Sequence, residues 1–186
     1  MRILIVDTET TGFKYTDRVV EIAAALYDVR LKTVLWQFSS LVYGPPDNAA
    51  ASINGIDPEA LPLAKDFYDP CEETLHYAEL ADALVAHNAE FDKRMIGCRL
   101  PTTKPWVCSQ RQLKFPRASK SKKLIHLAVD HGILAVGAHR ALGDVLMLVA
   151  LFRQTPDLED QVLAAIKVPL VESPDSNSPK VAGMET

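Results

Sequence analysis

Short apolar runs and mixed polar segments alternate along this chain, and the apolar runs predict the strands of a sheet. The run between Arg2 and Asp7 contains no polar residue, which is typical of a strand buried on both faces. Segments rich in Val, Ile, Leu, Tyr and Trp, with polar residues between them, predict strands at Val19–Val29 and Thr33–Val42. Two shorter apolar runs predict strands at Ala83–His87 and Trp106–Ser109.

Segments with helical patterning follow the first three strands. They are predicted at Pro70–Leu80, at Ala89 to about Arg99 with Asn88 as N-cap, at Lys123–His131 with Gly132 as the stop, and at Ala141–Gln154. Because strands come first and helices then alternate with strands, we expect an α/β domain with a mixed sheet.

The chain changes character after Gln154. Asp157–Lys167 has the pattern of one more helix, whereas Pro, Ser, Asp and Glu recur without a period beyond Pro169. We therefore expect one domain over residues 1–155, an extra helix within 156–168 and a disordered tail over 169–186.

Composition and charge narrow the class of protein. The 186 residues are 48% hydrophobic, and 20 basic against 24 acidic residues give a net charge of −4. That balance disfavours a protein that coats long duplexes but allows one that grips a short strand end. No apolar stretch approaches the roughly 20 residues of a membrane helix, and the amino end lacks the pattern of a signal peptide. Cys71, Cys98 and Cys108 form no CxxC pair, so we expect small buried thiols in a reduced, cytoplasmic setting.

Two acids stand at the end of the first predicted strand, in the sequence DTETTG. Residues two apart in a strand point to the same face, so Asp7 and Glu9 can converge while Thr8 faces away. Two such anions repel, and one would be protonated unless a cation neutralises them. Mg²⁺ or Mn²⁺ prefers oxygen ligands of this kind. A solvated strand end is the alternative interpretation of this pair.

Two further acids and a histidine are candidates for the same site. Asp144 is the sole charged residue in the apolar stretch ALGDVLMLVALF, where an unpaired carboxylate would be expensive to bury. Asp92 lies about one turn into a helix that follows a buried strand. His139 can share a site with Asp144 only from the loop before the helix, where Gly137 frees the backbone. Histidine titrates near pH 6.5 and is a natural base toward water.

Three motifs together resemble the DnaQ-like DEDDh family of 3′–5′ exonucleases, which includes proofreading epsilon subunits. They are DTETTG at Asp7–Gly12, followed by DRVVEIAA at Asp17–Ala24, then VAHNAEFD at Val85–Asp92 and HRALGDV at His139–Val145. The resemblance covers about Arg2 to Phe152. It implies a ribonuclease-H-like fold, a mixed sheet flanked by helices.

The resemblance also implies the chemistry. Asp7, Glu9 and Asp144 would bind two divalent ions, Mg²⁺ or Mn²⁺, with Asp92 completing the acidic set and His139 as the base. The expected activity is hydrolysis at the 3′ end of single-stranded DNA with release of nucleoside monophosphates. Substrate contacts are implied at Thr8, Thr10, Thr11, Gly12, Asn54, Asn88 and Phe91. Asn54 stands where family members often carry histidine. A polymerase or replication partner would have to bind through the region after Gln154.

Other functions stay open on the sequence alone. An RNA-trimming exoribonuclease would use the same chemistry, although such members usually carry Met in the first motif. A non-catalytic nucleic-acid-binding module would gain nothing from clustered negative charge. A phosphoryl transferase with an aspartate nucleophile would favour DxD over the DxE of Asp7 and Glu9. Five basic residues without an acid between Lys114 and Lys123 form either a phosphate-tracking loop or a solvated one.

Overall fold

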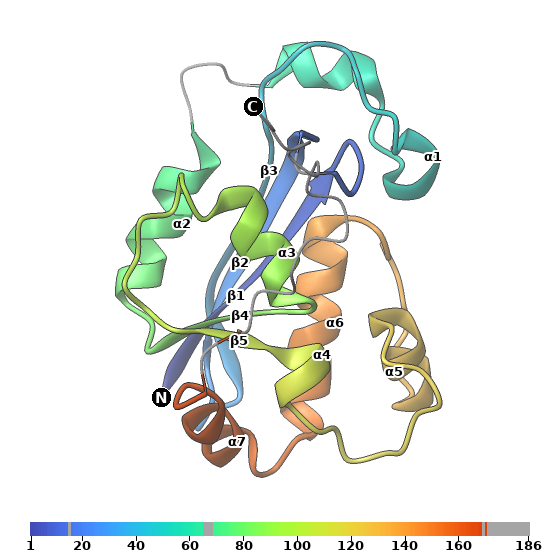
Figure 1. Cartoon of the computed structure of the whole chain (residues 1–186). Coiled ribbons are helices and arrows are strands. Elements are labelled where there is room, and N and C mark those ends of the chain that lie inside the picture. Colours follow the sequence, from blue (N-terminus) through green and yellow to red (C-terminus); the bar gives the residue numbers. More distant parts are fainter. Residues whose placement is uncertain (15, 65–68, 169, 171–186) are drawn as a thin grey trace, which may run out of the picture.

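One mixed sheet with helices on both faces forms the centre of the protein (Figure 1). The structure is a computed structural model and describes residues 1–14, 16–64, 69–168 and 170. The sheet has the strand order β3-β2-β1-β4-β5, in which β1, β2 and β3 are antiparallel and β4 and β5 run parallel to β1. The strands are β1 Arg2–Thr10, β2 Val19–Asp28, β3 Thr33–Leu41, β4 Ala83–Ala86 and β5 Trp106–Cys108. The five strands and the mixed sheet predicted from the apolar runs are confirmed.

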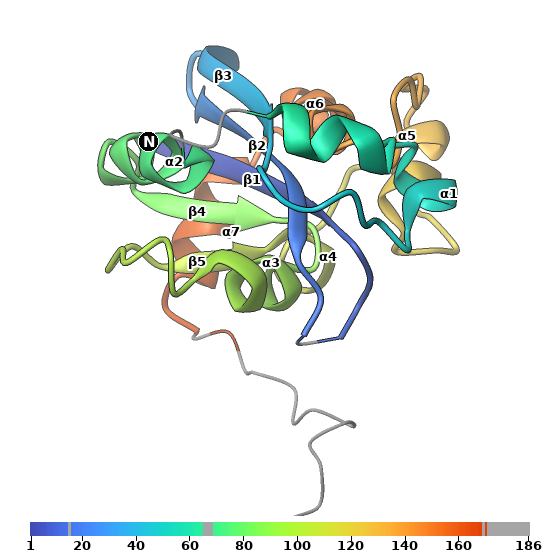
Figure 2. The same ribbon diagram turned by 90° about the horizontal axis from the view of Figure 1, so that it is seen from above.

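The central strand β1 contributes to two separate apolar layers. Ile3 and Ile5 pack with residues of α6 Ala141–Gln154 on one face, and Leu4 and Val6 pack with residues of α2 Pro70–Glu79 and α3 Ala89–Ile96 on the other. All four side chains are fully buried. Burial on both faces explains why this strand has an unbroken apolar sequence rather than an alternating one. Figure 2, seen from above, shows helices on either side of the sheet.

The long helices agree with the sequence prediction and the one-turn helices were missed. The remaining helices are α1 Ala51–Asn54, the 3₁₀ helix η1 Pro58–Leu63, α4 Ser109–Gln112, α5 Leu124–Asp130 and α7 Leu158–Ala165. The missed ones, α1, η1 and α4, are too short to show a helical period. None of the helices in the described ranges has the length and hydrophobicity to cross a bilayer.

The connection from β4 to α3 corrects two predictions. Asn88 precedes α3, but it has a φ of 74° and its side chain makes no capping hydrogen bond. The helix also ends at Ile96 rather than near Arg99. A direct turn from strand to helix needs one left-handed residue here, and asparagine tolerates that conformation better than most residues.

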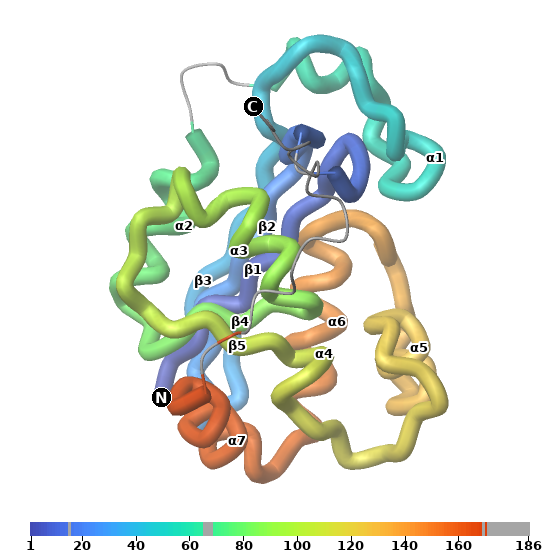
Figure 3. Tube along the Cα trace, viewed as in Figure 1, coloured from blue at the N-terminus to red at the C-terminus, as the bar shows by residue number. Residues whose placement is uncertain are grey.

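The last described helix, α7, packs against the end of the sheet at which β1 begins (Figure 3). Glu159 of α7 accepts from both Nε and Nη2 of Arg30, which follows β2, at 2.8 Å for the shortest contacts. The helix falls within the predicted range Asp157–Lys167. The predicted tail lies outside the described residues apart from Leu170, and the division into domain, helix and tail stays a prediction.

Candidate metal and phosphodiester site

Three carboxylates from two elements meet at the carboxyl end of β1. Asp7 and Glu9 come from one face of the strand, and Asp144 comes from the first turn of α6. One oxygen of each lies within 4.8 Å of the others. The two-residue period of the strand therefore does bring Asp7 and Glu9 to one spot, and the apolar helix adds the third acid.

The start of α6 is held in place by two close-packed glycines. A Cβ on Gly143 would clash with the carbonyl oxygen of Gly137, so only glycine lets the preceding loop fold this tightly onto the first turn. Gly137 has a φ of 72° and His139 a φ of 62°. This loop conformation lets the backbone N–H of His139 donate to Oδ1 of Asp144 at 3.2 Å.

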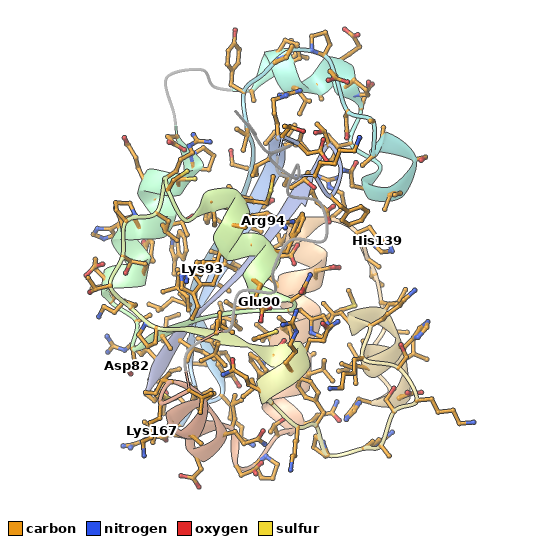
Figure 4. The ribbon with its side chains drawn as sticks, viewed as in Figure 1. Asp82, Glu90, Lys93, Arg94, His139 and Lys167 are labelled. Atoms are coloured by element: carbon orange, nitrogen blue, oxygen red, sulfur yellow. The ribbon has the colours of Figure 1, made fainter. Side chains whose placement is uncertain are left out.

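His139 lies in the loop before the helix, as its spacing from Asp144 requires. The residue is exposed, and Figure 4 shows it at the outer edge of the molecule beside the start of α6. The three-carboxylate group does not include its imidazole. The backbone of His139 therefore lies next to Asp144, while the residue as a whole is accessible to solvent.

Asp92 approaches the same strand from the opposite face of the sheet. It is 2% exposed, and its Oδ1 accepts from the hydroxyl of Thr8 at 2.8 Å. Thr8 points away from Asp7 and Glu9, as its position between them predicts. Asp92 is therefore close enough to act electrostatically on Asp7 but does not belong to the three-carboxylate group.

Burial and mutual repulsion make these acids hard to ionise. Burial raises the pKa of Asp7 well above its usual value, and the charges of Asp92 and Asp144 raise it further. Burial, with a further contribution from the charge of Asp144, raises the pKa of Glu9 to about 7. Burial also raises the pKa of Asp92 to about 7. The pKa of Asp144 is raised by burial, against the hydrogen bond from the His139 N–H, which lowers it.

The donor set fits a hard divalent cation. Three convergent carboxylate oxygens are ligands that Mg²⁺ and Mn²⁺ prefer, and the group contains no sulfur or imidazole that would favour a softer metal. A cation between the carboxylates would also remove the repulsion that raises the pKa of these groups.

A fifth acid, Glu21, has a role in the site that the sequence reasoning missed. It lies on β2 directly opposite Glu9 and is 3% exposed. Its carboxylate accepts four hydrogen bonds, from Nε and Nη2 of Arg140, from the N–H of Ala141 and from the hydroxyl of Ser39. The bonds to Arg140 and Ala141 tie the start of α6 to the sheet. The signal was the one charged residue inside the apolar run VVEIAAALY.

Several predicted substrate-contacting residues use their side chains within the protein. The hydroxyl of Thr10 donates to the carbonyl of Gly12 at 2.5 Å, and that of Thr11 accepts from the N–H of Arg18 at 3.0 Å. A Cβ on Gly12 would crowd the carboxylate of Asp17. These contacts shape the turn after β1.

Asn54 departs most from the expectation of a direct substrate contact. Its side chain is 2% exposed, and its Oδ1 accepts from Nδ2 of Asn48 and from the N–H of Ile56. Its Nδ2 donates to the carbonyl of Thr10 at 3.3 Å. Because these bonds occupy the amide, Asn54 holds the loop against β1 in this structure rather than offering its side chain to a ligand.

The last two predicted substrate residues lie at the carboxyl end of β4. Asn88 is half-buried in the turn into α3, and Phe91 is half-buried with its ring centroid 6.1 Å from that of the exposed Phe13.

Two other histidines have structural environments. His87 bonds to the hydroxyl of Ser109 and the carbonyl of Lys122, and His131 is 2% exposed. Its Nε2 accepts from the N–H of Arg117.

The thiols agree only in part with the expectation. Cys71 and Cys108 are buried. Cys98 is exposed, because it lies after the last turn of α3 and does not face the core.

Comparisons with known proteins give one family and one fold. The family model RNase_T, described as exonuclease, matches residues 4–152. A search of curated proteins gives no match. Among solved structures the chain is similar to E. coli exonuclease I in complex with a dT13 oligonucleotide, with 20% identity and a TM-score of 0.67 over 87% of this chain and 43% of that chain. This chain therefore spans less than half the length of exonuclease I.

Two shorter structures match over most of their length. One is exonuclease X in complex with 5′ overhanging duplex DNA, with 25% identity and a TM-score of 0.60 over 88% of this chain and 92% of that chain. The other is the nuclease domain of 3′hExo, a DEDDh family member, bound to rAMP, with 18% identity and a TM-score of 0.66 over 86% and 92%. These matches confirm the ribonuclease-H-like fold.

The raised pKa of Asp92 predicts how the stability of the metal-free protein depends on pH. A carboxyl whose pKa rises on folding, here from 3.8 to about 7, stabilises the fold below the lower value, and this contribution is lost as the pH rises through the higher one. Asp92→Asn keeps an oxygen to accept from Thr8 and removes the charge. We expect its thermal midpoint, measured with chelator, to exceed that of the wild type at pH 8, with an advantage that shrinks toward pH 5 and disappears only below about pH 4. The difference at pH 8 should be on the order of 4 kcal/mol.

Asp82→Asn is the control, because Asp82 is exposed beside the start of β1. An Asp92→Asn advantage that is equal at pH 5 and pH 8 would contradict this electrostatic account.

The contacts of Glu21 predict a loss of activity without unfolding. Glu21→Gln removes the charge that holds Arg140 and weakens the link between β2 and the start of α6, which carries Asp144 and directly follows the loop with His139. We expect kcat to fall roughly 10- to 100-fold, as for other residues that orient a metal-binding group, with an unchanged far-UV circular dichroism spectrum.

Glu159→Gln is a matched control, since it removes an equally bidentate but more exposed pair with Arg30 at the other end of the sheet. Equal kcat values for Glu21→Gln, Glu159→Gln and the wild type would rule out a positioning role for Glu21. A double variant with Arg140→Gln should lose little more than Glu21→Gln alone, because the two side chains act as one unit.

Proposed function

This chain belongs to the exonuclease family, of the DEDDh 3′–5′ type, and from that premise we propose that it hydrolyses phosphodiester bonds at the 3′ end of single-stranded DNA and releases nucleoside monophosphates. The observation that carries the proposal is the convergence of Asp7, Glu9 and Asp144 within 4.8 Å. Clustered buried carboxylates weaken a fold unless a cation uses them, and a divalent cation at such a site is suited to phosphate chemistry.

In this proposal each acid has a separate task. Asp7, Glu9 and Asp144 hold two divalent ions, Mg²⁺ or Mn²⁺, and Asp92 completes the set from the opposite face of β1. The bound ions would supply positive charge to the attacking and leaving oxygens of the displacement. Thr8 lies between Asp7 and Glu9 in β1, and its hydroxyl donates to Asp92. This bond connects Asp92 to the strand that carries two of the three convergent acids.

His139 is proposed as the group that takes the proton from the attacking water. Its exposure lets solvent and substrate reach the imidazole, and the bond from its N–H to Asp144 keeps its backbone beside the acids. A neutral imidazole can accept a proton, as a general base toward water must.

The turn after β1 is proposed to receive the end of the strand. The side chains of Thr10, Thr11 and Asn54 hold this turn, so their part in binding is to fix the backbone around Gly12. Phe91, packed near Phe13, offers an aromatic face on which any base can stack. Asn88 lies beside it at the end of β4.

The preference for DNA is part of the proposal, and RNA is its alternative. Similar structures include one in complex with a dT13 oligonucleotide and one bound to rAMP. The first motif, DTETTG, lacks the Met of oligoribonuclease-like members, which favours DNA. A polymerase partner and a cytoplasmic location stay predictions from the sequence.

The metal-binding acids predict a large loss of activity on neutral substitution. We expect Asp7→Asn and Asp144→Asn each to lower kcat/KM on a 5′-labelled single-stranded oligomer by on the order of 1,000-fold, because each removes a carboxylate that neutralises the ions. Chelator should abolish wild-type activity, and Mg²⁺ or Mn²⁺ should restore it. Stepwise shortening from the 3′ end, resolved on a sequencing gel, is the measurement.

Asp82→Asn serves again as the control, and Figure 4 shows Asp82 far from His139. Retention of full activity by both Asp7→Asn and Asp144→Asn would refute the site. Strand binding by the wild type that ignores metal and leaves the oligomer intact would instead indicate a non-catalytic binding module.

Substrate preference is predicted by the same proposal. Matched DNA and RNA oligomers, digested under identical metal and salt, should give a higher kcat/KM for DNA. A higher value for RNA would replace the proposed function by that of an exoribonuclease with the same catalytic residues.

A further inference from the structure

The loop between α4 and α5 concentrates positive charge in a protein whose net charge is −4. Its cations, called here the loop cations, are Lys114, Arg117, Lys120, Lys122 and Lys123. No acidic residue occurs from 112 to 129. All five residues are exposed. The loop is therefore a stretch of one sign of charge in a protein of opposite net charge.

The loop cations lack the carboxylate partners that other basic residues have. Five arginines elsewhere form ion pairs, namely Arg18, Arg30, Arg99, Arg111 and Arg140. None of the loop cations forms an ion pair within the part of the chain that the structure describes. Arg117 donates instead to the carbonyl of Asp130 at 3.2 Å. Charges that the protein leaves without a counter-ion are available to an anionic partner.

The backbone of the loop is held by specific contacts at three points. Lys114 exchanges two hydrogen bonds with the side chain of Gln161, at 2.7 and 3.1 Å. The N–H of Arg117 donates to Nε2 of the buried His131 at 3.0 Å. Nε2 of His87 bonds the carbonyl of Lys122 at 2.7 Å. Because the backbone is already ordered, less conformational entropy is lost when the lysines bind a ligand, unlike in a solvated free loop.

The third contact places the end of the loop next to the proposed site. A carbonyl only accepts, so Nε2 of His87 is the donor to Lys122, and Nδ1 accepts from the hydroxyl of Ser109. His87 directly follows β4, which runs parallel to β1, so both strands end at the same edge of the sheet.

From these observations we infer that the loop cations bind the backbone phosphates of the substrate strand upstream of its 3′ end. The inference rests on the proposed function, and it adds a second binding surface to the catalytic carboxylates. Lysine and arginine side chains bind phosphates without reading the bases, so the surface suits a single strand of any sequence. Strands long enough to reach the loop should therefore bind more tightly than the terminal nucleotides alone.

The test removes two loop charges and varies strand length and salt. Lys120→Gln with Lys122→Gln preserves the backbone bond to His87. We expect the Kd for a fluorescein-labelled 20-nucleotide single strand, measured by anisotropy with Ca²⁺, to rise about 10-fold near 0.1 M salt. The slope of log Kd against log salt should fall by about 1.4, which corresponds to two single-strand phosphates. On a dinucleotide, whose one internucleotide phosphate is the scissile one, the loss in kcat/KM should be much smaller than on the 20-mer.

The control variant is Lys32→Gln with Lys167→Gln, which removes the same charge elsewhere. Lys32 bonds the carbonyl of Arg153 at the far end of α6, and Figure 4 shows Lys167 away from His139. An equal Kd and salt slope for the two double variants would overturn the inference, as would an equal loss on the dinucleotide and the 20-mer. Because the binding measurement needs no turnover, failure of this surface is distinguished from absence of exonuclease activity, which the wild type alone would reveal.

Discussion

The mutual repulsion of buried carboxylates at the end of β1 is the constraint on which the site depends. One carboxylate oxygen each from Asp7, Glu9 and Asp144 lies within 4.8 Å of the others, in a partly desolvated position. Asp92 adds a fourth carboxylate from the opposite face of the sheet. Such groups separate unless something holds them. Two are fixed by the backbone of a strand that is buried on both faces and cannot shift without exposing apolar surface. The third depends on where α6 begins.

Glu21 and Arg140 determine where α6 begins. The buried carboxylate of Glu21 is one more negative charge opposite Glu9, but its hydrogen bonds from Arg140 and from the N–H of Ala141 satisfy it. An ion pair between a buried carboxylate and a half-exposed arginine adds little to stability by itself. Its effect is geometric, since it fixes the first turn of α6 to β2 and thereby aligns Asp144 with the carboxylates of β1. The fold thus uses one hydrogen-bonded acid to position another, Asp144.

Most of this arrangement could be predicted from sequence because it follows from local patterns. The period of a strand places Asp7 and Glu9 together, and an isolated acid in an apolar helix identifies Asp144. The missed features depend on contacts between distant segments. The sequence around Asn54 does not reveal that its side-chain amide donates a hydrogen bond to the carbonyl of Thr10. The left-handed conformation of Asn88 follows from the tight turn between β4 and α3. One-turn helices have no period to detect, and the burial of His131 requires knowing where the α4–α5 loop folds.

An acidic site in an acidic protein must still bind a polyanion, and the distribution of charge resolves this conflict. The carboxylates repel a phosphate until cations are bound, so metal binding and substrate binding are coupled, and a strand has little affinity for the metal-free site. A strand that also contacts Lys120 and Lys122 gains attraction that does not depend on metal. Because screening weakens that attraction over about 8–10 Å at ordinary salt, the loop acts chiefly on the nucleotides next to it. If the proposed roles hold, chemistry and strand retention can vary independently: the carboxylates and their ions would set the rate of each cleavage, and the loop would set how long a strand stays bound between cleavages.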